Sequence, residues 1–304
     1  MRYRFLTADV FTDRIFGGNP LAVLPDAAGL NDASMQAIAC ELNLSETTFV
    51  LPPDDPAHAR RVRIFTPARE LPFAGHPTIG TALVLAWRGE IAHAGEEREI
   101  VLEEGAGPVA VRIRWTGGRA TFAELTAPKA PEVRKAPEPA ALAAMLCLAP
   151  EDLCTGAGLP KMVSCGLPFL VVEVQNAGAL ARARLDRALW QGLLADAWAK
   201  EVFVITRDAA GLDVDFRTRM FAPAAGIEED PATGSAAAAL GGWLALHEVT
   251  ADGTQRYRVA QGLEMGRPSR LEIALERRAG ALLGVRVGGT AVPVSEGTLE
   301  MPAA

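Results

Sequence analysis

Two halves of this 304-residue chain carry the same series of motifs in the same order, at a spacing of about half its length. Three pairs of segments correspond: His76–Ala82 with Asp230–Ala236, Phe49–Leu51 with Phe203–Ile205, and Arg63–Ala68 with Arg219–Ala224. A single match of this kind arises by chance. Three matches in one order indicate a duplicated unit.

The duplication constrains the fold and leaves the chemistry open. It predicts two similar α+β domains, each with one buried helix, related by a pseudo-twofold axis with a ligand-binding cleft between them. We place the first domain at residues 1–127 together with a C-terminal strand at about 288–304, and the second at 128–287. The polar, proline-rich segment Ala127–Pro139 is the expected linker between them.

Composition narrows the classes of protein that fit. Hydrophobic residues make up 49% and charged residues 22% of the chain, as in ordinary globular proteins. A net charge of -7 argues against a nucleic-acid partner but permits a local anion site. The N-terminus lacks the apolar run of a signal peptide, and the apolar stretches are too short to span a bilayer. We expect a cytoplasmic protein with no membrane partner.

The four cysteines give no sign of a metal site. None forms a CxxC pair, and no histidine cluster accompanies them. We therefore expect no metal, and we expect the cysteines to be reduced, buried side chains that behave as small hydrophobic residues. They are Cys40, Cys147, Cys154 and Cys165.

Local patterns predict the elements of the first half. Asn31 or Asp32 is expected to cap a helix that runs to about Leu42, and the nearly all-apolar segment Ile79–Trp87 is expected to form a buried helix. A hairpin turn is expected at Gly117-Gly118. Strands are expected at Tyr3–Val10, Leu21–Leu24, Thr47–Leu51, Val62–Phe65, Ile100–Leu102, Val109–Trp115 and Thr121–Leu125.

The two repeated helix starts are candidate anion sites. Each combines a proline with small residues, among them Gly75, Gly80 and Gly234. Small residues let a ligand approach backbone N–H groups closely, and the positive end of a helix dipole favours an anion. One such start is explained by helix initiation alone. Two matched starts on one cleft favour the binding of a substrate carboxylate.

Polar side chains mark where the halves differ. Glu46 aligns with Lys200 and His76 with Asp230. Glu46 stands at an expected helix–strand junction, where partial burial would raise its pKa and let the carboxyl both accept and donate a proton. Spacing alone favours a surface carboxylate for Glu46 and, more strongly, a helix N-cap for Asp230, and it leaves a capping imidazole as the alternative for His76.

These residues fall in six motifs: Gly18–Val23, Asn43–Val50, Phe65–Pro67, Gly75–Gly80, Asp230–Ser235 and Gln261–Ser269. Together the motifs resemble the PhzF family of phenazine-biosynthesis-like proteins, from near the N-terminus to about residue 270. The resemblance implies the diaminopimelate-epimerase-like fold, in which two α/β domains each wrap a β-sheet around a central helix and the active site lies between them. It also implies a homodimer and no cofactor.

The resemblance also assigns roles. Glu46 is the proton shuttle, supported by His76, Asp230 and Ser235. Backbone N–H groups near Gly75 and Gly234 hold the substrate carboxylate, and Asn19 and Ser45 line the substrate site.

A contrast with two-base epimerases of the same fold narrows the chemistry. Those enzymes place a cysteine at each helix start, and neither helix start here contains one. We therefore expect a cofactor-independent isomerase that moves a proton on a small cyclic or amino-acid-like carboxylate through one carboxylic acid. An amino-acid-type epimerase or racemase and a non-catalytic small-carboxylate-binding protein are the alternatives. The motifs leave the substrate, and any role in phenazine metabolism, undetermined.

Overall fold

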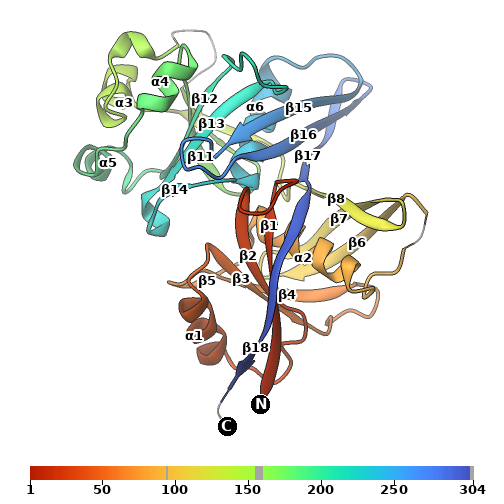
Figure 1. Ribbon diagram of the computed structural model, residues 1–304. Coiled ribbons are helices and arrows are strands. Elements are labelled where there is room, and N and C mark those ends of the chain that lie inside the picture. Colours follow the sequence, from red (N-terminus) through yellow and green to blue (C-terminus); the bar gives the residue numbers. More distant parts are fainter. Residues whose placement is uncertain (94, 155–159, 302–304) are drawn as a thin grey trace. The chain divides into compact units, whose positions relative to one another are not determined.

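The computed structural model describes residues 1–93, 95–154 and 160–301. The chain divides into two compact units, each with its own core. Unit 1 comprises Met1–Thr126 and Gly288–Ala304, and unit 2 comprises Ala127–Val287. Figure 1 draws the N-terminal strands of unit 1 in red and its C-terminal strand in blue.

Unit 1 is a mixed β-sheet with two helices. Its strands are β1 (Arg2–Val10), β2 (Asn19–Leu24), β3 (Glu46–Leu51), β4 (Arg60–Phe65), β5 (Glu70–Leu71), β6 (Glu97–Glu104), β7 (Gly107–Thr116), β8 (Arg119–Thr126) and β18 (Ala291–Glu300). β2 runs parallel to β3 and β4 parallel to β6, whereas β6, β7 and β8 form an antiparallel meander. Each strand predicted from the sequence is present, with bounds wider by a few residues.

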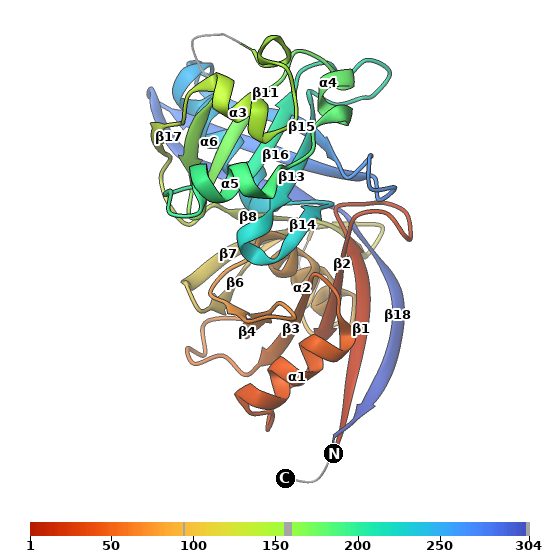
Figure 2. The same ribbon diagram turned by 90° about the vertical axis from the view of Figure 1, so that its left-hand side faces the viewer.

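The outer helix of unit 1, α1 (Asp32–Leu42), packs on β3 and β4 (Figure 2). Its N-cap is Asn31, whose side chain accepts a hydrogen bond from the Ser34 backbone, so the first of the two predicted caps is correct. Met35 and Ile38 of α1 pack with the edge-to-face pair Phe49 and Phe65.

The inner helix of unit 1, α2 (Gly75–Trp87), is buried along its length from Gly75 to Ala86 and packs against β1, β2, β7 and β8. The predicted buried helix is therefore correct, and it starts four residues earlier than the apolar pattern indicated. Gly80 makes the packing possible, because a Cβ there would lie 2.5 Å from Leu21 Cδ2.

Unit 2 is also a mixed β-sheet with outer helices and an inner helix. Its strands are β9 (Glu132–Lys135), β10 (Lys161–Ser164), β11 (Pro168–Glu173), β12 (Glu201–Thr206), β13 (Phe216–Ala222), β14 (Ile227–Asp230), β15 (Gly253–Gln261), β16 (Ser269–Arg278) and β17 (Ala281–Gly289), whose last two residues belong to unit 1. The helices α3 (Pro139–Met145), α4 (Ala177–Arg182) and α5 (Arg187–Leu194) share one core with β11 and β12 (Figure 1). The helix α6 (Gly234–His247) is almost wholly buried and packs against β10, β11 and β16.

Strand pairing shows that the two units share one topology. β2 and β3 pair in parallel, as do β11 and β12. β3 and β4 pair antiparallel, as do β12 and β13, and the next parallel partners are β6 for β4 and β15 for β13. The inner helix follows β5 in unit 1 and β14 in unit 2. The duplication read from the sequence thus extends to the strand pairing and the inner helix, whereas the outer helices that the structure describes differ in number.

The expected linker is partly structured. Within Ala127–Pro139, the segment Glu132–Lys135 forms β9 and pairs antiparallel with β10 of unit 2. β18 pairs with β1 of unit 1 in the corresponding way. The polar composition of β9 hid this strand, because an exposed edge strand lacks the apolar alternation that marks a strand in sequence. None of the helices in the described ranges is long and apolar enough to cross a membrane.

Candidate active site

Glu46 and His76 meet in the interior of unit 1. Glu46 is the first residue of β3 and His76 the second residue of α2, and both side chains are buried. Glu46 Oε2 lies 3.1 Å from His76 Nε2, close but not aligned as a full hydrogen bond. The two groups therefore lie within reach of a proton transfer.

Burial decides the charge state of the imidazole. It lowers the pKa of His76 to about 3, although a hydrogen bond to the Pro20 backbone acts in the opposite direction. His76 is therefore neutral near pH 7. A neutral imidazole that donates one proton to a backbone carbonyl has only an acceptor nitrogen left, so Nε2 can accept a proton donated by the Glu46 carboxyl but cannot donate to it.

The contact with Pro20 brings two motifs together. Gly18 precedes β2, and Asn19 and Pro20 are the first residues of this strand. Gly18 has a φ of +59°, and a Cβ on it would lie 2.2 Å from the Val10 carbonyl oxygen, so only glycine fits there. Asn19 is fully buried. The sequence-predicted residues of unit 1 thus gather where β2, β3 and the start of α2 meet.

Gly75 and Ser45 occupy the flanks of this region. Gly75 is the buried first residue of α2, and the N-cap residue Ala74 makes no side-chain hydrogen bond to the helix. The first-turn N–H groups therefore lack a capping side chain and retain the anion-binding character of a helix start. Ser45 precedes Glu46 and is half-buried.

The remaining site residues predicted from the sequence lie in unit 2. Asp230, the last residue of β14, is buried and accepts a hydrogen bond from the Thr233 hydroxyl. Gly234 is the buried first residue of α6, and Ser235, its second residue, is half-buried. The N-cap residue here is Thr233, which makes no side-chain hydrogen bond to the helix, so the arrangement matches that at α2. Asp230 does not cap the helix itself, contrary to the capping alternative.

Sequence reasoning missed the role of Gln261, which it assigned only to a motif. This fully buried amide donates to the Asp230 carbonyl at 2.7 Å and to the Thr233 hydroxyl at 3.1 Å. Its oxygen accepts from the Thr233 backbone N–H at 3.1 Å. Gln261 thus fixes the turn between β14 and α6 from the end of β15. The glutamine of the Gln261-Gly262 motif was the available signal.

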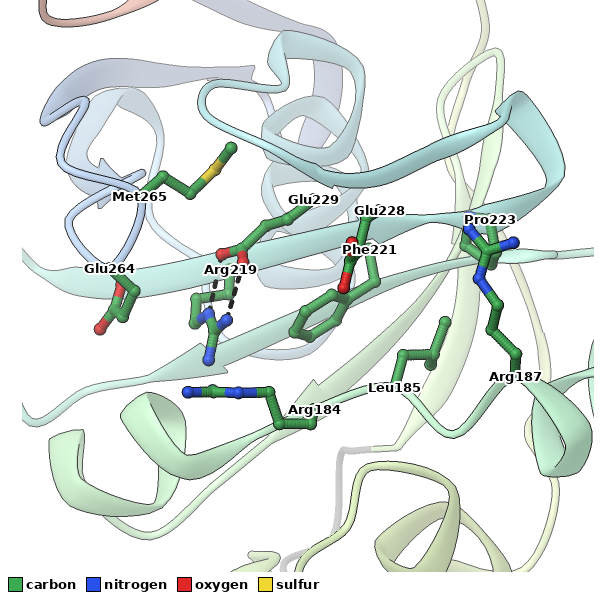
Figure 3. A pocket seen from close by; sticks show the side chains of 10 residues that line it. All are labelled: Arg184, Leu185, Arg187, Arg219, Phe221, Pro223, Glu228, Glu229, Glu264 and Met265. Atoms are coloured by element: carbon green, nitrogen blue, oxygen red, sulfur yellow. Dashed lines mark hydrogen bonds and ion pairs between the residues drawn. The ribbon is translucent and has the colours of Figure 1, made fainter.

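A buried ion pair joins β13 to β14. The Arg219 guanidinium forms a bidentate pair with Glu229, and its Nη1 also donates to the carbonyls of Leu180 and Ala183. This pair borders a cavity of about 650 Å³ within unit 2 (Figure 3). The lining includes Glu228, Glu229 and Glu264 but none of the sequence-predicted site residues. Asp230 directly follows Glu229, so the ion pair fixes the position of the strand that carries Asp230.

The cysteine prediction was only partly correct. Cys165 is buried, and burial raises the pKa of its thiol to about 12, as befits an inert core side chain. Cys40 and Cys147 are exposed, and Cys154 is half-buried. Among the residues that the structure describes, no three His, Cys, Asp or Glu side chains are grouped to hold a metal ion.

Known proteins match the chain over nearly its full length. The family model of the phenazine biosynthesis-like proteins matches residues 8–297. An uncharacterized isomerase of Mesorhizobium japonicum is 44% identical over 299 residues, covering 97% of this chain and 98% of that protein. The trans-2,3-dihydro-3-hydroxyanthranilate isomerase of Pseudomonas aeruginosa is 35% identical, with the same coverage of 97% and 98%.

The chain belongs to the phenazine biosynthesis-like (PhzF) family of isomerases. A PhzF-family crystal structure from Bacillus anthracis superposes with a TM-score of 0.89 at 26% identity, covering 99% of this chain and 100% of that one. A hydroxyproline epimerase from Agrobacterium vitis shares the fold, with a TM-score of 0.65 at 14% identity over 98% of this chain and 92% of that one. The predicted family, isomerase class and diaminopimelate-epimerase-like α+β fold are confirmed.

Proposed function

We propose that this PhzF-family protein is a cofactor-independent isomerase in which Glu46 moves a proton on a small cyclic or amino-acid-like carboxylate. The buried contact of Glu46 with His76 at the start of α2 carries this proposal. A carboxyl held out of water beside a neutral imidazole is able to give and take a proton near neutral pH. A protein that only binds carboxylates has no need of such a pair, which disfavours the non-catalytic alternative.

The reaction uses the carboxyl in two steps. Ionised Glu46 takes a proton from one carbon of the substrate, and the carboxylic acid so formed can donate to the acceptor nitrogen of neutral His76. The resulting carboxylic acid then donates the proton to a second carbon. The electron pair that the departing proton leaves on the first carbon moves into the adjacent double bond. The double bond therefore shifts, and no oxidation occurs. Glu46 returns to its starting charge.

The substrate carboxylate is placed by backbone N–H groups. We assign these to the uncapped first turns at Gly75 and Gly234. Asn19 and Ser45 accompany the first helix start as substrate-binding residues, and Ser235 and Asp230 support the second. A two-thiol racemisation is disfavoured, because neither helix start carries a cysteine.

The relative named for trans-2,3-dihydro-3-hydroxyanthranilate supplies the first compound to test. In deuterated water the unmodified protein (the parent chain) should place deuterium on the substrate carbon that gains the proton. Glu46→Gln should abolish incorporation while the fold is retained, because the amide cannot accept a proton from carbon. Exposed Glu41 gives the matched control Glu41→Gln. Undiminished deuterium incorporation by Glu46→Gln would contradict the assignment of Glu46 as the proton-transferring group.

An epimerase of an amino acid or related acid is the second candidate, since the same carboxyl serves inversion at one carbon. Chiral chromatography of the products separates the two reactions: inversion without movement of a double bond establishes the epimerase. A homodimer in a cytoplasmic setting completes the proposal, and sedimentation of the purified chain measures its oligomeric state.

A further inference from the structure

A second buried acid, Glu104, contacts the inner helix of unit 1 two residues after His76. Glu104 is the last residue of β6 and has 8% of its surface exposed. Its Oε1 lies 2.5 Å from Thr78 Oγ1, and Thr78 is fully buried. The same hydroxyl lies 2.7 Å from the carbonyl oxygen of Ala74, the N-cap residue of α2. Glu104, Thr78 and Ala74 therefore form one chain of contacts.

The number of protons available to these two contacts fixes the protonation state of Glu104. Two short oxygen–oxygen contacts need two protons. The Ala74 carbonyl has none to give, and the Thr78 hydroxyl has one. The second proton can come only from a protonated Glu104 carboxyl. The hydrogen bonds then run from Glu104 to the Thr78 oxygen and from the Thr78 hydroxyl to the Ala74 carbonyl.

The surroundings of Glu104 favour the same state. Its other oxygen, Oε2, has no hydrogen-bond partner among the described residues, so an ionised carboxyl there would carry an uncompensated buried charge. Burial raises the pKa of Glu104 to about 8, against the smaller lowering effect of a hydrogen bond that the Thr78 hydroxyl can donate to the ionised carboxylate.

Charged groups on neighbouring elements are engaged elsewhere. Residues Gly107 and Pro108 of β7, which face Glu104 and the residue before it, do not titrate. Titratable groups on β4, the loop before it, and α2 pair elsewhere: Arg60 with Glu90, Arg61 with Asp54, Arg63 with Glu70, His58 with Glu103, and His76 with Glu46. On β6, Arg98 donates to the Ala92 carbonyl and Glu99 pairs with Arg112. Burial and the Thr78 contact, rather than these charges, are what shift the pKa of Glu104.

We propose that Glu104 is a positioning residue for the active site, which as a protonated acid holds the Ala74 carbonyl through the Thr78 hydroxyl and so fixes the first turn of α2. That turn carries His76 and the N–H groups assigned to the substrate carboxylate, so this inference rests on the proposed function. Loss of the Glu104 proton turns the Thr78 hydroxyl towards the carboxylate and releases Ala74. The buried negative charge also opposes an anion at the helix start.

Backbone amide resonances of the full chain test this without any substrate. In the parent chain the Gly75, His76 and Thr78 amides should shift with a midpoint near pH 8. Glu104→Gln should remove that midpoint, because its side-chain amide donates to Thr78 Oγ1 at every pH. Glu103→Gln, the matched control on the same strand, should leave the midpoint in place, since Glu103 bonds the Asp54 and Asp55 backbone. A midpoint that survives in Glu104→Gln overturns the proposal.

A second measurement needs no variant. With glutamate carboxyl carbons labelled in the parent chain, one resonance should titrate near pH 8 while most others titrate near about 4.3. The absence of a late-titrating glutamate contradicts the proposal even where Glu104→Gln fails to fold.

Catalysis supplies the functional readout. The alkaline limb of the deuterium-exchange rate should follow the Glu104 titration in the parent chain and disappear in Glu104→Gln. Thr78→Val should raise KM about tenfold or more, the equivalent of one hydrogen bond to the helix turn, and Thr78→Ser should restore it. An alkaline limb unchanged in Glu104→Gln overturns the positioning role. An inactive parent chain whose amides still titrate near pH 8 instead refutes the proposed function.

Discussion

The starts of α2 and α6 occupy the same place in a duplicated topology, yet different chemistry supports them. At α2 a buried acid, Glu104, holds the helix turn through Thr78. At α6 an amide, Gln261, holds the turn through Thr233. An amide donates at every pH, whereas an acid donates only when protonated. The comparison teaches that the frame was kept after duplication while the polar contacts at each helix start diverged.

The same divergence separates Glu46 from its counterpart. Lys200, which aligns with Glu46, is exposed, and its backbone carbonyl accepts a hydrogen bond from the Trp190 indole. The lysine therefore serves the packing of α5 through its main chain, and its side chain faces water. Unit 1 carries the carboxyl–imidazole pair, and unit 2 supplies Asp230 and its support.

The largest expected effect comes from removing the charge at the second helix start. Asp230→Asn keeps an oxygen to accept the Thr233 hydrogen bond, so the turn should persist. Loss of the carboxylate should lower kcat about a hundredfold, the scale of a group that assists proton transfer. Exchange kinetics measure this, with exposed Glu228→Gln as the control on the same strand. Parent-like kcat in Asp230→Asn would confine the chemistry to unit 1.

Gln261→Glu tests the acid–amide contrast itself. The new carboxyl must be protonated to donate to the Asp230 carbonyl, so its folded-state pKa is raised above its unfolded value. Stability should be parent-like at low pH and fall as pH rises, by about 1–3 kcal/mol once the carboxyl ionises. Urea unfolding across pH measures the difference. A constant difference between Gln261→Glu and the parent chain would break the comparison.

The shared frame predicts matched packing costs in the two inner helices. A Cβ at Gly80 would lie 2.5 Å from Leu21 Cδ2, and one at Gly241 would lie 2.6 Å from Ile273 Cγ2. Overpacking costs about 1–3 kcal/mol and outweighs the gain of up to about 1 kcal/mol from replacing a helical glycine. Gly80→Ala and Gly241→Ala should each lower the unfolding free energy. Exposed Gly192 on α5, where a Cβ meets nothing, is the control.

A further effect, confined to acid pH, concerns His76. Its folded-state pKa of about 3 lies below the unfolded value, so its neutral form stabilises the fold above about pH 6.5 and this contribution is lost as pH falls. His76→Gln should therefore lose less stability than the parent chain between neutral pH and pH 4. Parallel pH profiles in thermal unfolding would show that folding does not lower the pKa of His76.

The sequence predicted most of the frame because the frame follows local patterns. The repeat, the apolar run of α2 and the Asn31 cap are all visible in short windows. The pairing of Glu46 with His76 came through motifs whose spacing in the chain does not reveal contact.

The supporting contacts were beyond local reasoning. Glu104 meets Thr78 across 26 residues, and Gln261 meets Thr233 across 28, and such contacts depend on which strand ends beside which helix. β9 escaped for a related reason, because four mostly polar residues between prolines form a strand only where β10 offers hydrogen bonds.

Transfer of a label within the substrate tests the single carboxyl most directly. The substrate, trans-2,3-dihydro-3-hydroxyanthranilate in the first instance, carries deuterium at the carbon that loses the proton, and one turnover is followed in ordinary water. Because the Glu46 side chain is only 11% exposed, its acquired deuteron should exchange slowly with water. The account predicts that part of the deuterium appears at the second carbon, and that Glu46→Gln transfers none. Product that forms with every label lost to water would contradict it.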